Sequence, residues 1–312
     1  MGCVRAPHQM VCPRLSPARD AATDAVTMLS SDQKAAYAHD GYLVLPGFKP
    51  AAELDALRRR AHQIVANFDP AQGAGIFSTT DQTHSADDWF LGSGDKVRCF
   101  FEAEALDTQG HLRRPLAESI NKIGHAMHDL DPVFDAFSHG PALAQLAADI
   151  GLAQPQIVQS MFIFKPPGIG GEVDWHQDAT YLITEPMTVT GFWFALEDAT
   201  VNNGCLWVQP GGHRGPLRER FIRAPGADAN SRKVRVDRLD NTPWPGPADA
   251  VPLEARAGTL VCFHALLPHY SAPNRSAQSR HAYTLHAVDG SSAWSALNWL
   301  QRGSGLPLRG FV

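Results

Sequence analysis

The C-terminal half of the chain consists of short apolar runs separated by turns rich in glycine and proline. These runs cover residues 156–165, 188–196, 205–208, 259–263 and 280–288. Each has the length of an ordinary β-strand, and a chain with five to eight such strands buries their apolar faces in a β-sandwich or a closed barrel. The pattern therefore predicts a mainly β core at about residues 155–290. Residues 214–257, rich in Pro, Asp, Arg and Asn, are interpreted as an insertion between two of its strands.

The N-terminal half is predicted to be largely helical and to pack against this β core. Residues 51–68 place their leucines and other apolar side chains on one face of a helix. Further helices are expected before residue 40 and at 132–138 and 141–150, strands at 42–45 and 96–102, and a hairpin-like excursion at 103–114. Residues 121–128 fit either a strand or the end of a helix. We expect residues 29–312 to form a single domain, mainly β with flanking helices, behind a disordered leader at 1–28.

Composition restricts the kinds of partner. The net charge of −5 over 312 residues favours neither a nucleic-acid surface nor a polybasic membrane patch, and no apolar run is long enough for a membrane span. The five cysteines are scattered without a Cys-x-x-Cys pair, which is typical of free thiols in a reducing compartment. We therefore expect a cytoplasmic protein that acts on a small-molecule substrate, with no nucleic acid or membrane as partner. Composition leaves the oligomeric state open.

An imidazole and a carboxylate stand two residues apart, at His176 and Asp178. Residues i and i+2 of an extended segment share a face, so both side chains can point at one metal ion. A further histidine from a later strand would complete a two-His, one-carboxylate triad, which holds non-haem Fe(II) and leaves positions for a co-substrate and O₂. Candidates for this third ligand are His213, His264, His269, His281 and His286. His264 and His269 would face opposite ways on one continuous strand, and spacing alone does not choose among the candidates.

Arg280 opens the β-rich run RHAYTLHAV and is the candidate cation of the site. An iron site that uses a dicarboxylate co-substrate needs a positive charge at some distance from the metal. A guanidinium group is suited to this task because its planar fork meets a carboxylate through two parallel hydrogen bonds.

Four separate segments resemble the phytanoyl-CoA dioxygenase family. They read SINKIGHAMHDLDPVF, QIVQSMFIFKPPGIGGEVDWHQDATYLITEP, GFWFALEDATVNNGCLWVQPGGH and LLPHYSAPNRSAQSRHAYTLH. The likeness runs in the same order from about residue 31 to residue 300. It implies a double-stranded β-helix (jelly-roll, cupin-like) core and the activity of an Fe(II)- and 2-oxoglutarate-dependent dioxygenase. Such an enzyme would oxidise a C–H bond of a small, mainly apolar organic molecule with O₂ and release succinate and CO₂.

The resemblance also implies roles for individual residues. It makes His176, Asp178 and His269 the iron ligands. It implies contacts with 2-oxoglutarate for Lys122, Met161, Trp193, Ser271 and Arg280. Halogenating relatives carry a small residue in place of the carboxylate ligand, so the presence of Asp178 favours hydroxylation or a similar oxidation.

Two other functions remain open at this stage. A cupin-like hydrolase or isomerase could hold another metal, such as zinc, in the same triad without 2-oxoglutarate. Alternatively, the chain could bind metal and 2-oxoglutarate without turnover. The cations Arg280 and Lys122 argue against the first alternative, because a hydrolase needs no clamp for a dicarboxylate. The intact triad argues against the second.

Overall fold

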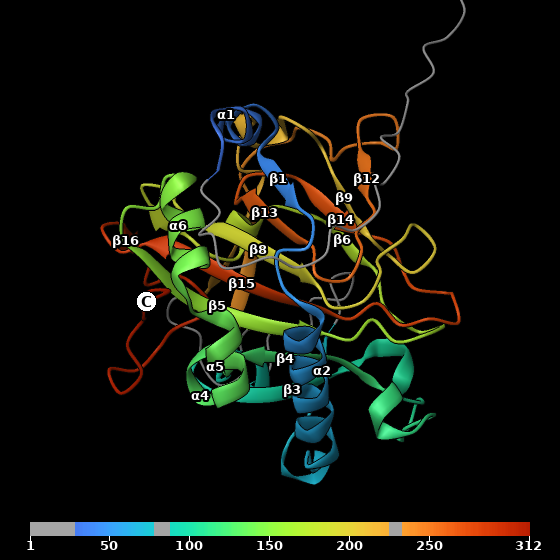
Figure 1. Ribbon diagram of the computed structural model, residues 1–312. Helices are drawn as coiled ribbons and strands as arrows, with labels where there is room; N and C mark the ends of the chain where they lie inside the picture. Colours follow the sequence, from blue (N-terminus) through green and yellow to red (C-terminus); the bar gives the residue numbers. More distant parts are fainter. Residues whose placement is uncertain (1–28, 78–87, 225–232) are drawn as a thin grey trace, which may run out of the picture.

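An eight-stranded sheet is the largest element of the computed structural model, which describes residues 29–77, 88–224 and 233–312. Its strands follow the order β1 (Tyr42–Leu45), β13 (Leu260–His264), β8 (Thr190–Ala195), β15 (Ala282–Asp289), β5 (Pro155–Ile163), β4 (Ile120–His125), β3 (Val97–Glu102) and β2 (Gly75–Phe77). Neighbouring strands pair antiparallel, except that β2 is parallel to β3. In Figure 1 this order runs from β1 at the top to β3 at the bottom.

A second, four-stranded sheet packs on one face of the large sheet. Its strands are β12 (Val251–Leu253), β9 (Leu206–Val208), β14 (His269–Ser271) and β6 (Val173–His176), in this order. Side chains from both sheets share one hydrophobic cluster, in which Trp193 and Phe263 of the large sheet join Val208 of the small one. Two antiparallel sheets that enclose a common core form a sandwich. We call the face of the large sheet that looks into this sandwich its inner face.

Helices cover the outer face of the large sheet. They are α2 (Ala51–Ala66), α4 (Met127–Leu130), α5 (Pro132–Ser138) and α6 (Pro141–Asp149), and Figure 1 shows α2, α5 and α6 in front of the strands. Strand alternation decides which residues meet them: Phe194 of β8 packs edge-on against Phe137 of α5, with ring centroids 5.1 Å apart, while its neighbour Trp193 points inward. The helices thus seal one face and leave the inner face for a site.

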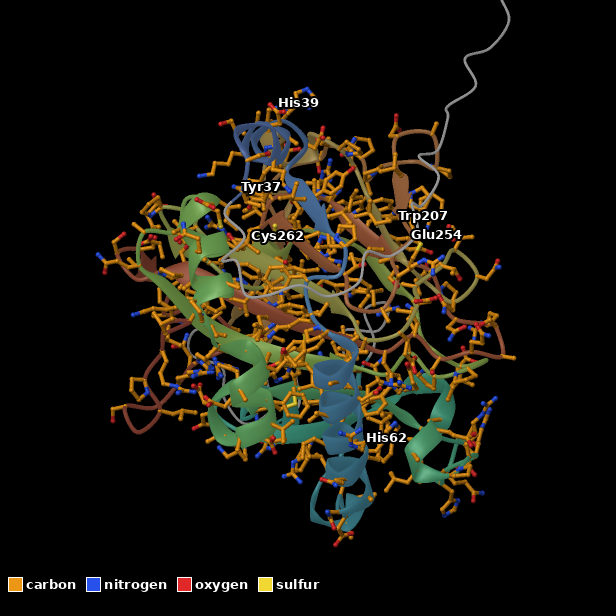
Figure 2. The ribbon with its side chains drawn as sticks, viewed as in Figure 1. Tyr37, His39, His62, Trp207, Glu254 and Cys262 are labelled. Atoms are coloured by element: carbon orange, nitrogen blue, oxygen red, sulfur yellow. The ribbon has the colours of Figure 1, made fainter. Side chains whose placement is uncertain are left out.

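The first helix, α1 (Ser31–Asp40), anchors the start of the described chain on the same sheet. Ser30 and Gln33 form a capping box, since each side chain accepts a hydrogen bond from the backbone N–H of the other. Tyr37 of α1 packs on the cluster that contains Cys262 of β13, and Figure 2 shows the two side chains close together. Burial raises the pKa of the Tyr37 hydroxyl, so this tyrosine acts as a neutral packing residue.

Short elements complete the structure. Two antiparallel strand pairs lie outside the main sheets: β10 (Glu219–Arg223) with β11 (Val234–Arg238), and β7 (Thr184–Glu185) with β16 (Ala293–Trp294). α3 (Asp88–Leu91) and the 3-10 turns η1 (Pro70–Gln72), η3 (Ala103–Ala105), η4 (Leu116–Glu118), η5 (Asp178–Thr180) and η6 (Gly212–Arg214) lie in the connections. None of the helices in the described part of the chain has the length and apolar character that a membrane span requires.

Most elements expected from the sequence are present. The five C-terminal runs correspond to β5, β8, β9, β13 and β15, and the helices expected at 51–68, 132–138 and 141–150 are α2, α5 and α6. The ambiguous stretch 121–128 is a strand, β4, followed by the short helix α4. The strands expected at 42–45 and 96–102 are β1 and β3, and because β2 and β4 join them in the large sheet, the N-terminal half is not the largely helical unit expected. The expected leader at 1–28 lies outside the described residues.

The contact between α5 and β15 on the outer face of the large sheet can be tested by substitution. Phe134 of α5 is fully buried against Tyr283 of β15, with ring centroids 5.3 Å apart. Phe134→Ala should lower the free energy of unfolding by about 3–5 kcal/mol, because it removes a large side chain from a dense core. Tyr283→Phe removes only a hydrogen bond of 2.7 Å to Ser138 and should cost about 1 kcal/mol. Urea unfolding measures both changes; a loss under 1 kcal/mol for Phe134→Ala would contradict this packing.

Candidate metal centre and its pocket

The register of the small sheet brings two histidines together. His176 is the last residue of β6 and His269 the first of β14, and the antiparallel pairing sets them opposite each other. Asp178 follows two residues after His176, at the start of the 3-10 turn η5. Its Oδ1 lies 3.8 Å from Nε2 of His176 and 3.6 Å from Nε2 of His269. One ligand atom from each residue lies within 4.8 Å of the other two, so the three side chains converge on one point.

Backbone contacts fix the tautomer of both imidazoles. Nδ1 of His176 lies 2.8 Å from the carbonyl oxygen of Asp174, and Nδ1 of His269 lies 3.0 Å from that of Leu267. A carbonyl oxygen only accepts, so each Nδ1 carries the proton and donates it. Each Nε2 is therefore an unprotonated nitrogen that faces Asp178. This is the form in which histidine binds a metal ion, with the other nitrogen held by a backbone group.

Asp178 is held from the side of the large sheet. A Cβ atom at Gly191 of β8 would lie 2.9 Å from its Oδ2, so only a glycine leaves room for this carboxylate above the strand. Nε2 of His286, on β15, lies 3.0 Å from the same oxygen. Nδ1 of His286 is 3.1 Å from the side-chain nitrogen of Gln159 on β5, which donates to it. The chain Gln159–His286–Asp178 therefore orients Oδ2 and leaves Oδ1 facing the two histidines.

The electrostatics of the triad suit a cation. Burial and the neighbouring imidazole of His269 lower the pKa of His176 to about 3, so it is neutral at physiological pH. Burial alone would raise the pKa of Asp178, but the neighbouring His286 and His269 outweigh it and hold the pKa of this carboxyl below its ordinary value. Two imidazoles whose Nε2 atoms face one ionised carboxylate form a facial donor set that fits Fe(II).

Arg280 lies just before β15 with its guanidinium group buried. Nε donates to the carbonyl oxygen of Gly204 at 3.0 Å, and Nη2 donates to Oγ of Ser271 at 3.1 Å. Nη1 is buried and has no hydrogen-bond partner among the described residues, and the residue forms no ion pair with a carboxylate of that part of the chain. Burial lowers the pKa of Arg280 to about 10, which still leaves it charged at neutral pH. An unpaired buried guanidinium is costly unless an anion joins it.

Lys122, on β4, is a second buried cation without a carboxylate partner in the described residues. Its Nζ lies 3.7 Å from Sδ of Met161 and 3.4 Å from the ring centroid of Phe77. Burial lowers the pKa of Lys122 to about 7, so a bound anion would favour its protonated form.

One cavity connects these groups. It has about 1320 Å³ of open space, counting its mouth, and it lies between the inner face of the large sheet and the small sheet. Met161, Thr284 and Trp193 stand side by side on three neighbouring strands of its floor. All eight residues named from the sequence line this cavity: Lys122, Met161, His176, Asp178, Trp193, His269, Ser271 and Arg280. Their individual roles remain predictions.

Of the other histidines weighed as third ligand, His286 lines the cavity beside Asp178, whereas His213, His264 and His281 do not line it. His264 ends β13 in the large sheet, and its Nδ1 accepts a hydrogen bond of 3.1 Å from the backbone of Leu266. Its ring packs on His213, with centroids 5.4 Å apart, and burial lowers the pKa of His264 to about 4. His281 faces the outer side, where its Nδ1 lies 3.5 Å from Glu197. Only His269 joins His176 and Asp178 as a group of possible ligands in the described residues.

His286, His125 and Gln159 are among the polar residues of the cavity that sequence reasoning missed. His286 was considered only as a ligand, whereas it contacts the carboxylate ligand; His125 and Gln159 were given no role in the site, yet both line the cavity. A signal existed for two of them. Arg280 and His286 are an even number of residues apart, and so are Gln159 and Met161. Strand alternation therefore places the two residues of each pair on the same face of the sheet. No comparable periodicity identifies His125, because it stands at the end of β4.

Comparisons with known proteins identify the family of the chain. The family model "Phytanoyl-CoA dioxygenase (PhyH)" matches residues 37–282. Phytanoyl-CoA dioxygenase domain-containing protein 1 of Mus musculus is 44% identical over 286 residues, covering 89% of this chain and 97% of the relative. Phytanoyl-CoA dioxygenase of Arabidopsis thaliana is 41% identical over 279 residues, covering 88% and 94%.

A solved structure shows the same fold. The epimerase SnoN, in complex with Fe³⁺, alpha ketoglutarate and nogalamycin RO, superimposes with a TM-score of 0.57 at 16% identity, covering 88% of this chain and 90% of that one. This likeness supports the jelly-roll arrangement of the two sheets. From the extent of the family match and the identity to its members, the chain belongs to the phytanoyl-CoA dioxygenase family, a family of oxidoreductases that use Fe(II), 2-oxoglutarate and O₂.

Proposed function

We propose that the chain binds Fe(II) through His176, Asp178 and His269 and binds 2-oxoglutarate beside it. It would oxidise, typically hydroxylate, a C–H bond of a small and mainly apolar organic molecule, with release of succinate and CO₂. The observation that carries this proposal is the pair of buried cations, Arg280 and Lys122, that lack a carboxylate partner in the described chain and line the same cavity as the triad. A dicarboxylate supplies the missing charge.

The remaining contacts support this arrangement. Ser271 accepts from Arg280 and donates to the carbonyl oxygen of Gly204 at 2.9 Å, so it fixes the fork of the guanidinium. Met161 and Trp193 give the co-substrate an apolar floor that excludes water, which strengthens the charge–charge contact. Bound iron would supply the activation of O₂. The protein's own contribution is to place the co-substrate, the metal and the substrate in one shielded cavity.

The domain and compartment are part of the same proposal. Residues 29–312 would act as one catalytic domain in the cytoplasm. Cys99, Cys205 and Cys262 are free and buried, which fits a reducing compartment.

A spectral titration without O₂ separates this function from the two alternatives. A weak metal-to-ligand charge-transfer band on adding Fe(II) and 2-oxoglutarate requires that both bind at one centre. A hydrolase or isomerase would show metal binding without the band. A module without turnover would show the band but form no succinate with any substrate when O₂ is admitted.

Removal of a metal ligand should be distinguishable from damage to the fold. His176→Ala and His269→Ala should each weaken Fe(II) binding by more than about 100-fold, above the effect typical of residues that only support ligands. His264→Ala is the matched control, because it removes a partly buried histidine of the same region that makes no ligand contact. Metal content after dialysis measures binding, and circular dichroism confirms folding. Metal loss in His264→Ala but not in His269→Ala would mean that the third ligand is misassigned.

Replacement of the proposed carboxylate ligand, Asp178, can be followed through the oxidation product as well as through metal content. Asp178→Gly should abolish succinate-coupled hydroxylation even where some iron remains, because two histidines alone do not complete the donor set. Product analysis by mass spectrometry checks this outcome, and normal hydroxylation would contradict the assignment of Asp178.

Arg280→Leu should weaken 2-oxoglutarate binding far more than iron binding. The loss of a buried two-point contact with a carboxylate should cost roughly 2–5 kcal/mol, or about 30-fold to several-thousand-fold in affinity. Arg280→Lys should recover only part of this, since a point charge does not reproduce the fork. Lys122→Ala should have a smaller effect of the same kind. Anaerobic titration of the charge-transfer band gives the affinity, and an unchanged affinity in Arg280→Leu would leave that arginine with a structural role only.

The pKa of Lys122 predicts a pH dependence of co-substrate binding. Burial lowers this pKa to about 7, and a nearby carboxylate favours the protonated amine, so binding takes up a proton above neutral pH. The affinity for 2-oxoglutarate should therefore fall as pH rises from 7 to 9, by at most about tenfold per unit. Lys122→Met should flatten the profile. A wild-type affinity that is constant over this range would show that Lys122 does not contact the co-substrate.

A further inference from the structure

His125 is a buried imidazole in the cavity that takes no part in the metal site described above. It ends β4, is 1% exposed, and lines the cavity. Aromatic rings surround it: the centroids of Phe90, Phe100 and Trp299 lie 5.7, 5.6 and 5.0 Å from that of His125. Phe221 stands 6.5 Å from Phe90 and extends this wall. We call Phe90, Phe221 and Trp299, which line the cavity, the aromatic wall.

The hydrogen bonds of Ser93 determine which nitrogen of His125 carries the proton. Oγ of Ser93 lies 2.5 Å from the backbone carbonyl oxygen of Phe90, and a carbonyl oxygen only accepts, so the single hydroxyl proton is donated there. Oγ also lies 2.8 Å from Nδ1 of His125. With its proton already used, this oxygen accepts, and Nδ1 is the donor. In the neutral ring Nε2 is then left as a bare acceptor.

That acceptor has no partner in the described chain. Nε2 of His125 is buried and makes no hydrogen bond there. The ring stays neutral, because burial and the nearby Lys122 and His286 hold the pKa of His125 well below its ordinary value. A buried polar atom without a partner is rare in native proteins, and at the wall of a cavity it indicates a group that a ligand satisfies.

A second acceptor lines the same cavity. Oε1 of Gln159 is also buried and has no partner among the described residues, while the amide nitrogen of Gln159 donates to Nδ1 of His286. Both free groups are thus acceptors, in contrast to Arg280 and Lys122, which are donors. Acceptors bind hydroxyl or N–H groups and disfavour carboxylates.

We propose that His125 is a substrate-binding residue whose Nε2 accepts a hydrogen bond from a hydroxyl or N–H group of a largely apolar, ring-bearing substrate. The aromatic wall takes the apolar body of that substrate, and Gln159 offers a second acceptor for a further donor. This inference rests on the proposed function for the position of the substrate beside the metal centre. It names the substrate class: apolar molecules with at least one donor, and not molecules whose only polar group is an anion.

Three ligands of similar size test whether the cavity prefers a molecule with a hydrogen-bond donor. 1-Naphthol carries a hydroxyl donor, 1-fluoronaphthalene is close to it in size without a donor, and 1-naphthoate carries an anion. Equilibrium dialysis against the full chain with Fe(II) and 2-oxoglutarate, without O₂, gives the three affinities. Wild type should bind 1-naphthol at least about tenfold more tightly than 1-fluoronaphthalene, and 1-naphthoate least. Equal affinities for the first two probes, or preference for 1-naphthoate, would overturn the proposal.

Two variants test whether Nε2 of His125 causes the preference for 1-naphthol over 1-fluoronaphthalene. His125→Phe keeps a ring in the aromatic wall and removes the acceptor, so the ratio of the two affinities should fall by about tenfold. Comparing ratios between proteins cancels the different hydrophobicity of the probes. His62→Phe is the control: His62 on α2 also packs against a ring, Phe164, at 5.9 Å, but it lies on the outer side of the sheet (Figure 2). Its ratio should match wild type, and an unchanged ratio in His125→Phe would contradict the assignment.

A second route does not depend on the folding of His125→Phe. Ser93→Ala removes the acceptor that holds the proton on Nδ1, so the proton can move to Nε2 and the ratio should fall towards one. In wild type, a long-range ¹⁵N–¹H spectrum should show a protonated Nδ1 and a bare Nε2 for His125, and 1-naphthol should shift Nε2 upfield. A protonated Nε2 in the free protein would overturn the proposal. The same samples report metal and 2-oxoglutarate binding separately, so a failed metal centre is told apart from a failed donor preference.

Discussion

The pairing of β14 with β6 is the contact on which the functional site depends. It sets His269 opposite His176, although 92 residues separate them in the chain, and the turn after β6 delivers Asp178 to the same point. The large sheet then supplies what the small sheet lacks. Gly191 gives the carboxylate room, and His286 orients its outer oxygen. A metal site between two sheets is therefore also a constraint on how they pack, since a shift of one strand by a single residue would turn its ligand away from the cavity.

Buried cations make the other half of the site. Arg280 and Lys122 are almost fully shielded from solvent, and the described chain gives neither a carboxylate partner. Removing these two cations from water costs free energy of folding. The packing of the helices on the outer face of the sheet offsets this cost. The same desolvation makes them strong binders of an anion that enters the cavity, because charge–charge attraction increases as water is excluded. Under the proposed function, this cost in stability gives the protein a preformed site for the co-substrate.

Much of this could be predicted from the sequence, and the reason is local periodicity. Runs of alternating or continuous apolar residues located β5, β8, β13 and β15, and alternation put Gln159 and Met161 on one face. Local rules did not reveal that His264 and His269 belong to different sheets, because that depends on where the chain crosses the sandwich. The family resemblance, rather than spacing, distinguished His269. His125 escaped both kinds of reasoning: its importance lies in a hydrogen bond with Ser93, 32 residues away, that fixes its tautomer.

The polar groups of the cavity are sorted along the sheet. Arg280 and His286 lie six residues apart on one run of chain, a separation of roughly 20 Å in extended backbone. The free donor of Arg280 lies at the first of these residues, and the free acceptors of Gln159 and His125 lie towards the second, where His286 contacts Asp178. A dicarboxylate and a substrate with a hydroxyl or N–H donor would consequently be directed to different ends of one cavity. The buried guanidinium of Arg280 favours an anion at its end of the cavity, and the free Nε2 of His125 favours a hydrogen-bond donor at the other end. Which end of the cavity each molecule occupies is then set by hydrogen-bond polarity.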